Sequence, residues 1–275
     1  MQGSSAKISF LQLGIIMLLV NGLVSHVIIN PMILGASGRD AWLVPLCTMA
    51  ALVPWCLVLY AIMRNSGQQK LQPWLAGKIG PFFSWLLVLP VCLQIYFIGA
   101  STTFHTGAWT VASYLPETPE LALVLILLAV CTFCAVTGIR AIAIGAGALL
   151  PFVIILGYFV SLSNMPNKEW RLLKPFLEHG WGPVGSGMLY AGGCFMELAL
   201  LVAMQHHLKS KVKWWQLLIL AAVLIHIMLG PIVGAITEFG PREAAKQMES
   251  PYEQWRLVKI GEYVEHVDFF SVYQW

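Results

Sequence analysis

Charged residues are scarce in this sequence: Asp, Glu, Lys and Arg make up 11% of its 275 positions, whereas 58% are hydrophobic. Soluble domains carry about 25% charged residues. A single soluble core cannot bury this much apolar surface, so the composition indicates a membrane protein and excludes a disordered tail. The net charge of +3, from 16 basic and 13 acidic residues, also argues against nucleic acid or another polyanion as a partner.

A spaced cysteine framework is also missing. All six cysteines lie in apolar stretches, which excludes a disulfide scaffold and favours buried thiols. Cys131 and Cys134 form a C-x-x-C pattern, but without the strand that accompanies a redox motif. His206 and His207 are adjacent and therefore point apart on a helix, so no metal-ligand set is visible. With no nucleophile–base pair either, we expect a protein that is not an enzyme and uses no cofactor or metal.

Long apolar runs fill most of the chain. A helix that crosses the bilayer needs about 20 mostly apolar residues, and lipid offers no partner to open backbone, so helices are expected. The first run continues past Asn21-Gly22 to spanning length, which favours a retained helix over a signal peptide. The sequence predicts an all-α polytopic membrane protein with seven spans, at about 8–34, 41–63, 82–114, 121–138, 141–162, 184–205 and 214–237.

The distribution of charge predicts a cytoplasmic N-terminus. In that orientation the short inner segments carry eight Lys or Arg residues and no acid, in line with the positive-inside rule. The outer segments also carry eight, but half of these lie in the last, longer stretch, which weighs less. Residues 71–80 have the pattern of a short interfacial helix and 164–183 that of an ordered outer loop, although a solvated connector would explain either.

The end of the sequence differs from the rest. After Glu238 the composition becomes soluble, with a charged helical pattern over 252–260. Apolar and aromatic residues then return from Val267 to Trp275. This is the pattern of the start of an eighth span, so we expect seven full transmembrane helices and the beginning of another.

Glu197 is the one carboxylate in the middle of a predicted span. An ionisable group at that depth costs at least about 2.5–3.5 kcal/mol on insertion scales, which makes it a functional candidate. Helical spacing places Tyr190, Gly193 and Cys194 on the same face. Since no Lys or Arg lies within a span core, Glu197 is uncharged, faces water or accepts hydrogen bonds. A neutral acid bonded to a neighbouring helix is the structural alternative.

Residues that weaken a helix interrupt two of the predicted spans. Asn21-Gly22 interrupts the first span, and Gly192-Gly193 interrupts the sixth. Glycine is also common in membrane helices because it lets neighbouring helices pack closely. However, helices one and six are equivalent positions in two five-helix repeats, and paired broken helices point to a transporter-type site at the bilayer midplane. Unwound backbone at these positions would offer N–H and C=O groups to a ligand.

The third predicted span carries a polar stripe. Gln94, Ser101 and His105 share one face at positions i, i+7 and i+11. We expect this face to line the same cavity. The histidines inside the spans, and His206 and His207 at the inner end of the sixth, are interpreted as structural or interfacial.

Several segments resemble the spore germination permease family, which comprises the B subunits of nutrient germinant receptors and belongs to the amino acid–polyamine–organocation superfamily. The most specific match joins residues 252–257 to residues 268–275. The other matching segments are 20–22, 30–32, 38–42, 172–176, 180–183 and 193–198.

The resemblance implies an inverted-repeat fold of ten helices, with 1–163 as the first five-helix repeat and 184–275 as an incomplete second one. This chain departs from the family in two respects. Val24 and Ser25 stand where relatives often have glycine, and the chain ends where the family continues through three more spans. We therefore expect a ten-helix design cut short.

The resemblance also implies a function. A small nutrient, an amino acid or a sugar, would bind between helices one and six, and the chain would signal germination in the spore inner membrane together with an A subunit and a lipoprotein C subunit. The alternative is a secondary transporter of amino acids or similar solutes, with proton coupling through Glu197. The site candidates are Asn21, Gly22, Ser25, Gly192, Gly193 and Glu197, supported by Gln94 and Ser101 of the third span.

Overall fold

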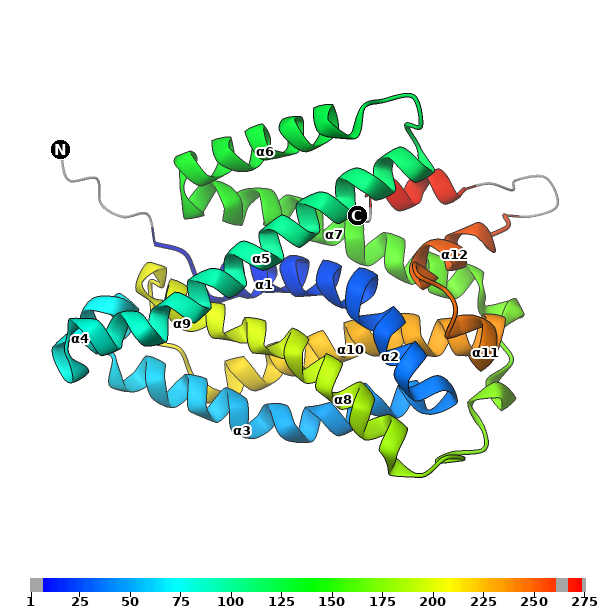
Figure 1. Cartoon of the computed structure of the whole chain (residues 1–275), viewed down its shortest axis with the longest axis horizontal. Coiled ribbons are helices and arrows are strands. Elements are labelled where there is room, and N and C mark those ends of the chain that lie inside the picture. Colours follow the sequence, from blue (N-terminus) through cyan, green and yellow to red (C-terminus); the bar gives the residue numbers. More distant parts are fainter. Residues whose placement is uncertain (1–6, 261–266, 274–275) are drawn as a thin grey trace. The chain divides into compact units, whose positions relative to one another are not determined.

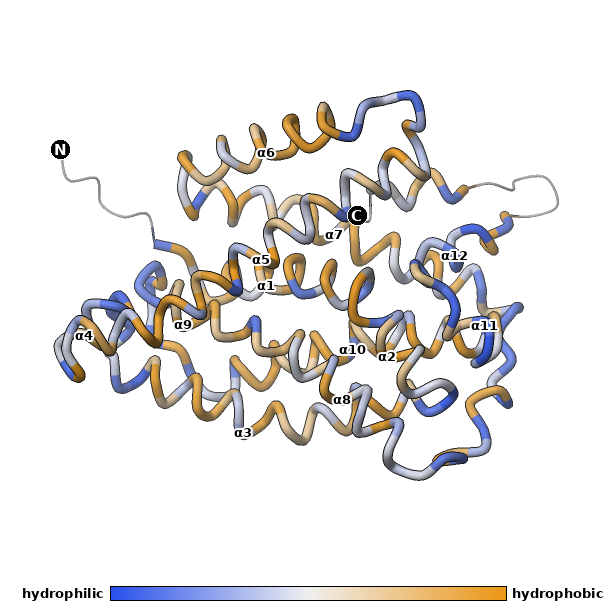
Figure 2. Tube along the Cα trace, viewed as in Figure 1, coloured by the Kyte–Doolittle hydropathy of each residue, from blue (hydrophilic) through white to orange (hydrophobic). Residues whose placement is uncertain are grey.

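The computed structural model of the chain describes residues 7–260 and 267–273, and its named elements over that part are all helical (Figure 1). Within these described ranges, six helical segments are long and apolar enough to cross a membrane, and Figure 2 shows the hydrophobic residues that dominate them. These segments are Asn30–Asn65, Pro81–Ser113, Glu120–Thr137, Ile139–Ser163, Trp181–His207 and Trp214–Phe239. The prediction of an all-α polytopic membrane protein is confirmed.

The first two predicted spans are divided differently in the structure. Helix α1 (Phe10–Val24) continues through the π-helical turn η1 (Ser25–Ile29) into α2 (Asn30–Ser37). A 3-10 turn, η2 (Gly38–Trp42), then joins α2 to α3 (Leu43–Asn65). Residues 30–65 thus count as one apolar segment, and α1 alone has only 15 residues. Hydropathy contains no information about a change of helical pitch. The predicted spans therefore join α1 and α2 in one span and place a boundary between α2 and α3.

The remaining spans lie close to their expected positions. They are α5 (Pro81–Ser113), α6 (Glu120–Thr137), α7 (Ile139–Ser163) and α10 (Trp214–Phe239), together with a sixth span built from α8 (Trp181–Phe195), η5 (Met196–Ala199), α9 (Leu200–Met204) and η6 (Gln205–His207). Glycine sets two of the boundaries. Gly80 and Gly138 have φ values of 83° and 93°, a region that other residues rarely adopt, and each ends one helix directly before the next.

Shorter elements connect the spans. The helix expected at 71–80 forms as α4 (Leu71–Ile79). The segment before α8 contains two 3-10 turns, η3 (Met165–Asn167) and η4 (Trp170–Leu173). The backbone N–H of Glu169 donates to the carbonyl of Thr237 over 2.8 Å, so this loop is fixed to α10.

The charged segment after α10 is also helical. It contains α11 (Pro241–Ala244), α12 (Ser250–Arg256) and η7 (Asp268–Tyr273), while Gln274 and Trp275 lie outside the described residues. Trp255 and Val258 are each 1% exposed and form a cluster with Val160 of α7 and Val267. This segment therefore packs on α7 through its own apolar cluster.

The chain forms two compact units. Unit 1 contains the described parts of Met1–Ile16, Leu59–Gly147 and Leu198–Val212. Unit 2 contains Met17–Val58, Ala148–Glu197 and the described parts of Lys213–Trp275. Both units draw on the two predicted repeats, and the five-plus-five repeat stays a prediction.

Candidate functional site

Helices one and six both change pitch inside unit 2. The π-helical turn η1 begins at Ser25, and the 3-10 turn η5 begins at Met196. The expected unwinding at Asn21-Gly22 and Gly192-Gly193 is not present, because these residues lie within α1 and α8. Membrane helices tolerate glycine without opening, since unpaired backbone is costly in lipid. The irregular turns instead follow the glycines by three or four residues, and such turns often mark functional sites.

Asn21 and Glu197 join the two helices. The Asn21 Nδ2 group donates to Glu197 Oε2 over 3.1 Å, and it lies 3.3 Å from the carbonyl oxygen and 3.1 Å from the Sγ atom of Cys194. Asn21 is 1% exposed and Glu197 is 3% exposed. Of the three alternatives that the sequence left open for Glu197, hydrogen-bond acceptance is the one seen in the structure. Cys194 shares the Glu197 face, as the helical spacing predicts.

The other amide atom of Asn21 is an unused acceptor. Asn21 Oδ1 is buried and has no hydrogen-bond donor among the described residues. Most buried polar atoms in proteins are bonded, so such an atom calls for an explanation. No Lys or Arg occurs in α1, η1, α8 or η5. The site is therefore rich in acceptors and has no Lys or Arg on these four elements.

Ser25 and His26 fix the start of the π-helical turn. The Ser25 hydroxyl donates to the carbonyl of Gly22 over 3.0 Å, and His26 Nδ1 lies 2.7 Å from the same oxygen. Ser25 is 1% exposed. The predicted candidates Gly22 and Ser25 are thus bonded to each other within the helix that carries Asn21, and His26 shares the same acceptor.

The glycines of helix six differ in their surroundings. A Cβ atom at Gly192 or Gly193 would meet no other atom within 4 Å, and the same holds for Gly22. At Gly187 a Cβ atom would collide with Ser37 and Val44. Close packing therefore explains Gly187, but it does not explain Gly192 or Gly193.

The third-span candidates belong to the other compact unit. Gln94 and Ser101 are on α5, in unit 1, where Gln94 is half-buried and Ser101 is exposed. Their part in the same cavity stays a prediction. In the part of the chain that the structure describes, no three His, Cys, Asp or Glu side chains gather as metal ligands would.

Comparisons with known proteins give matches over nearly the whole chain. A family model described as "Spore germination protein" matches residues 7–275. The chain is 39% identical over 268 residues to "Spore germination protein XB" of Bacillus anthracis, an alignment that covers 98% of this chain and 75% of the relative. No solved structure gives a significant match. Both matches span the helices that carry Asn21 and Glu197.

Proposed function

The chain belongs to the spore germination protein family, and from this premise we propose that it is the membrane subunit of a spore germinant receptor that binds a small nutrient and signals germination. The observation that carries the proposal is the buried contact between Asn21, one turn before η1 in helix one, and Glu197 in η5 of helix six. Paired irregular helices are the usual location of a transporter-type ligand site.

The chemistry of the site favours a nutrient with an amino group. Asn21 Oδ1 is a buried acceptor without a donor, and Glu197 adds carboxylate acceptors. An ammonium group has three N–H donors and a charge that matches a carboxylate. A sugar offers hydroxyl donors but no charge. We therefore propose an amino acid as the nutrient in preference to a sugar.

Signalling would result if the ligand competes with Asn21 for the hydrogen bond to Glu197. A ligand shifts a conformational equilibrium only by its differential affinity for two states. An ammonium group that bonds to Glu197 would weaken the bond from Asn21 Nδ2, and the contact between helices one and six would change. We propose that the A and C subunits of the receptor detect this change in the spore inner membrane.

A germination assay on spores tests this proposal. Wild-type spores, and spores that lack only this subunit, are exposed to a panel of amino acids and sugars, and the fall in optical density is followed. We expect the response to at least one amino acid to need this chain. Identical responses of the two strains to every nutrient would contradict a receptor function.

A secondary transporter is the second candidate, because Glu197 is a buried carboxylate within a membrane-spanning segment and such groups also serve proton coupling. Proteoliposomes that contain the purified chain separate the two functions. Saturable nutrient binding without flux supports the receptor, whereas accumulation of labelled solute supports the transporter.

A further inference from the structure

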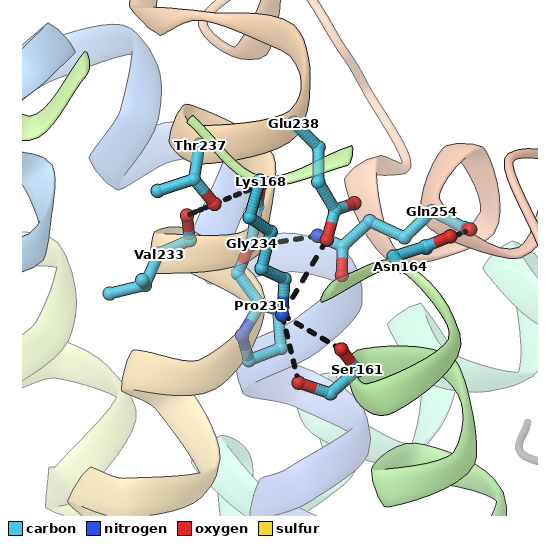
Figure 3. Close-up of polar contacts among 9 residues, drawn as sticks. All are labelled: Ser161, Asn164, Lys168, Pro231, Val233, Gly234, Thr237, Glu238 and Gln254. Carbon is cyan, nitrogen blue, oxygen red and sulfur yellow. Dashed lines mark hydrogen bonds and ion pairs between the residues drawn. The ribbon is translucent and has the colours of Figure 1, made fainter. Parts of the chain in front are cut away.

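A second buried polar group lies at the far end of α10 from Trp214, where Lys168 and Glu238 form an ion pair (Figure 3). The two side chains are 6% and 1% exposed, and Lys168 Nζ lies 3.7 Å from Glu238 Oε1. The ion pairs formed by Arg39, Arg171, Lys246 and Arg256 each have an exposed partner. In contrast to these four pairs, Lys168 and Glu238 are both withdrawn from water.

The two partners of the pair are unequally satisfied. Lys168 Nζ donates to the carbonyl oxygen and to the hydroxyl of Ser161, each over 3.0 Å. Neither carboxylate oxygen of Glu238 accepts a hydrogen bond from the described residues. Glu238 also lies in the last turn of α10, where the helix dipole disfavours a negative charge. Lys168 is thus the one group that the structure shows compensating Glu238.

Three elements meet at this ion pair. Asn164, at the end of α7, donates to the carbonyl of Gln254 in α12 over 2.7 Å. Gln254 in turn donates to the carbonyl of Pro231 in α10 over 2.9 Å, as Figure 3 shows. Beside the pair, the bond from the Glu169 N–H to Thr237 holds the loop of residues 164–174 on α10. Release of the pair would loosen this loop.

The same stretch of chain continues to both helices of the candidate site. Beyond residue 174 it is bonded to η2 and to the end of α2, because Asp40 accepts from the N–H of Leu177 over 2.9 Å and Ser37 donates to the carbonyl of Pro183 over 2.8 Å. It then enters α8, whose far end carries Cys194. The chain and these hydrogen bonds therefore connect the ion pair to both helices of the site.

We propose that Lys168 and Glu238 form a latch that holds the loop of residues 164–174 on α10, and that its release sets the nutrient concentration at which the chain responds. A buried ion pair with unmade hydrogen bonds offsets its desolvation poorly, so the released state, with Glu238 in water, lies close in free energy. A two-state element of this kind is what a ligand can bias. The inference rests on the proposed nutrient response.

The test uses the double variant Lys168→Gln/Glu238→Gln, because Lys168→Gln alone leaves a buried carboxylate without compensation and endangers folding. The control is Arg171→Gln, which breaks an exposed pair with Glu169 in the same loop. In spores with either variant, the nutrient concentration for half-maximal germination rate is measured. We expect a roughly tenfold decrease for the double variant, since the response-competent state becomes more populated, and none for the control. An unchanged or increased concentration would overturn the proposal.

Hydrogen exchange of the purified full chain in nanodiscs, without nutrient, provides a readout that does not need a germinant. We expect faster exchange over residues 164–174 in the double variant, with the control at the wild-type rate. Unchanged exchange overturns the latch, and so does faster exchange without a shift of the germination curve. If wild-type spores respond to no nutrient through this chain, the proposed function fails, whereas the exchange experiment still decides whether the pair holds the loop.

Discussion

The Asn21 side chain has more hydrogen-bond acceptors near its Nδ2 group than it has N–H hydrogens to donate. Its Nδ2 group carries two hydrogens, but Glu197 Oε2 and both the carbonyl oxygen and the Sγ atom of Cys194 lie within hydrogen-bond distance. The three acceptors therefore have to share two hydrogens, and a small change in side-chain position would redistribute the bonds. Under the proposed function, a ligand amine would supply the missing donor.

Glu197→Gln tests the charge of the site. The substitution keeps the size of the side chain but removes the carboxylate that would pair with an ammonium group. Because a hydrogen bond to a charged group contributes about 1.5–3 kcal/mol, we expect the half-maximal concentration of an amino acid germinant to rise about tenfold or more. Germination curves over a series of pH values measure this, with Glu243→Gln, which removes an exposed carboxylate in α11, as the control. Wild-type curves at every pH would exclude a role for Glu197.

At the scale of the helices, the sequence predicts which elements form and which two are irregular, but not where they change pitch. The lengths of the apolar runs, together with the glycines before Pro81 and Ile139, make most helix ends predictable. The turns at Ser25 and Met196 depend on packing between helices, which no local pattern encodes. The Asn21–Glu197 bond likewise spans 176 positions, so the sequence names both residues but not their contact. The sequence gives no signal for a functional role of Glu238, because this residue lies at the boundary between the last apolar span and a soluble segment.

Because the glycines of helix six have different surroundings, two alanine variants are expected to differ in stability. At Gly187 the added methyl group collides with Ser37 and Val44, so Gly187→Ala is expected to cost about 1–3 kcal/mol of stability. At Gly193 the added methyl group enters open space, so Gly193→Ala should change stability by no more than about 0.5–1 kcal/mol. Thermal unfolding of the two purified variants in the same detergent measures the difference. Equal unfolding temperatures would show that Gly187 is not a packing position.

At the scale of the whole molecule, composition is the most secure predictor, because 58% hydrophobic residues have no other solvent than lipid. In the part of the chain that the structure describes, six segments long enough to cross the bilayer agree with it. The direction of insertion has a weaker basis, since it depends on where a few Lys and Arg residues lie. The family match adds the biological setting, germination, which no physical property of the chain contains.

The predicted orientation can be tested at the two ends of the sixth span. Trp181–His207 is long and apolar enough to cross the membrane once, which would put the loop before it and the segment after it on opposite sides. The segment after it carries Lys209, Lys211 and Lys213 and no acid, so the positive-inside rule predicts a cytoplasmic location for it. Cysteines introduced at the exposed positions Asn167 and Lys209 test this with an impermeant maleimide on intact protoplasts. We expect Asn167→Cys to be labelled at once and Lys209→Cys only after lysis, because in the predicted orientation only the former faces the medium. The reverse pattern would invert the orientation and would place the Lys168–Glu238 latch on the cytoplasmic side, away from an external nutrient.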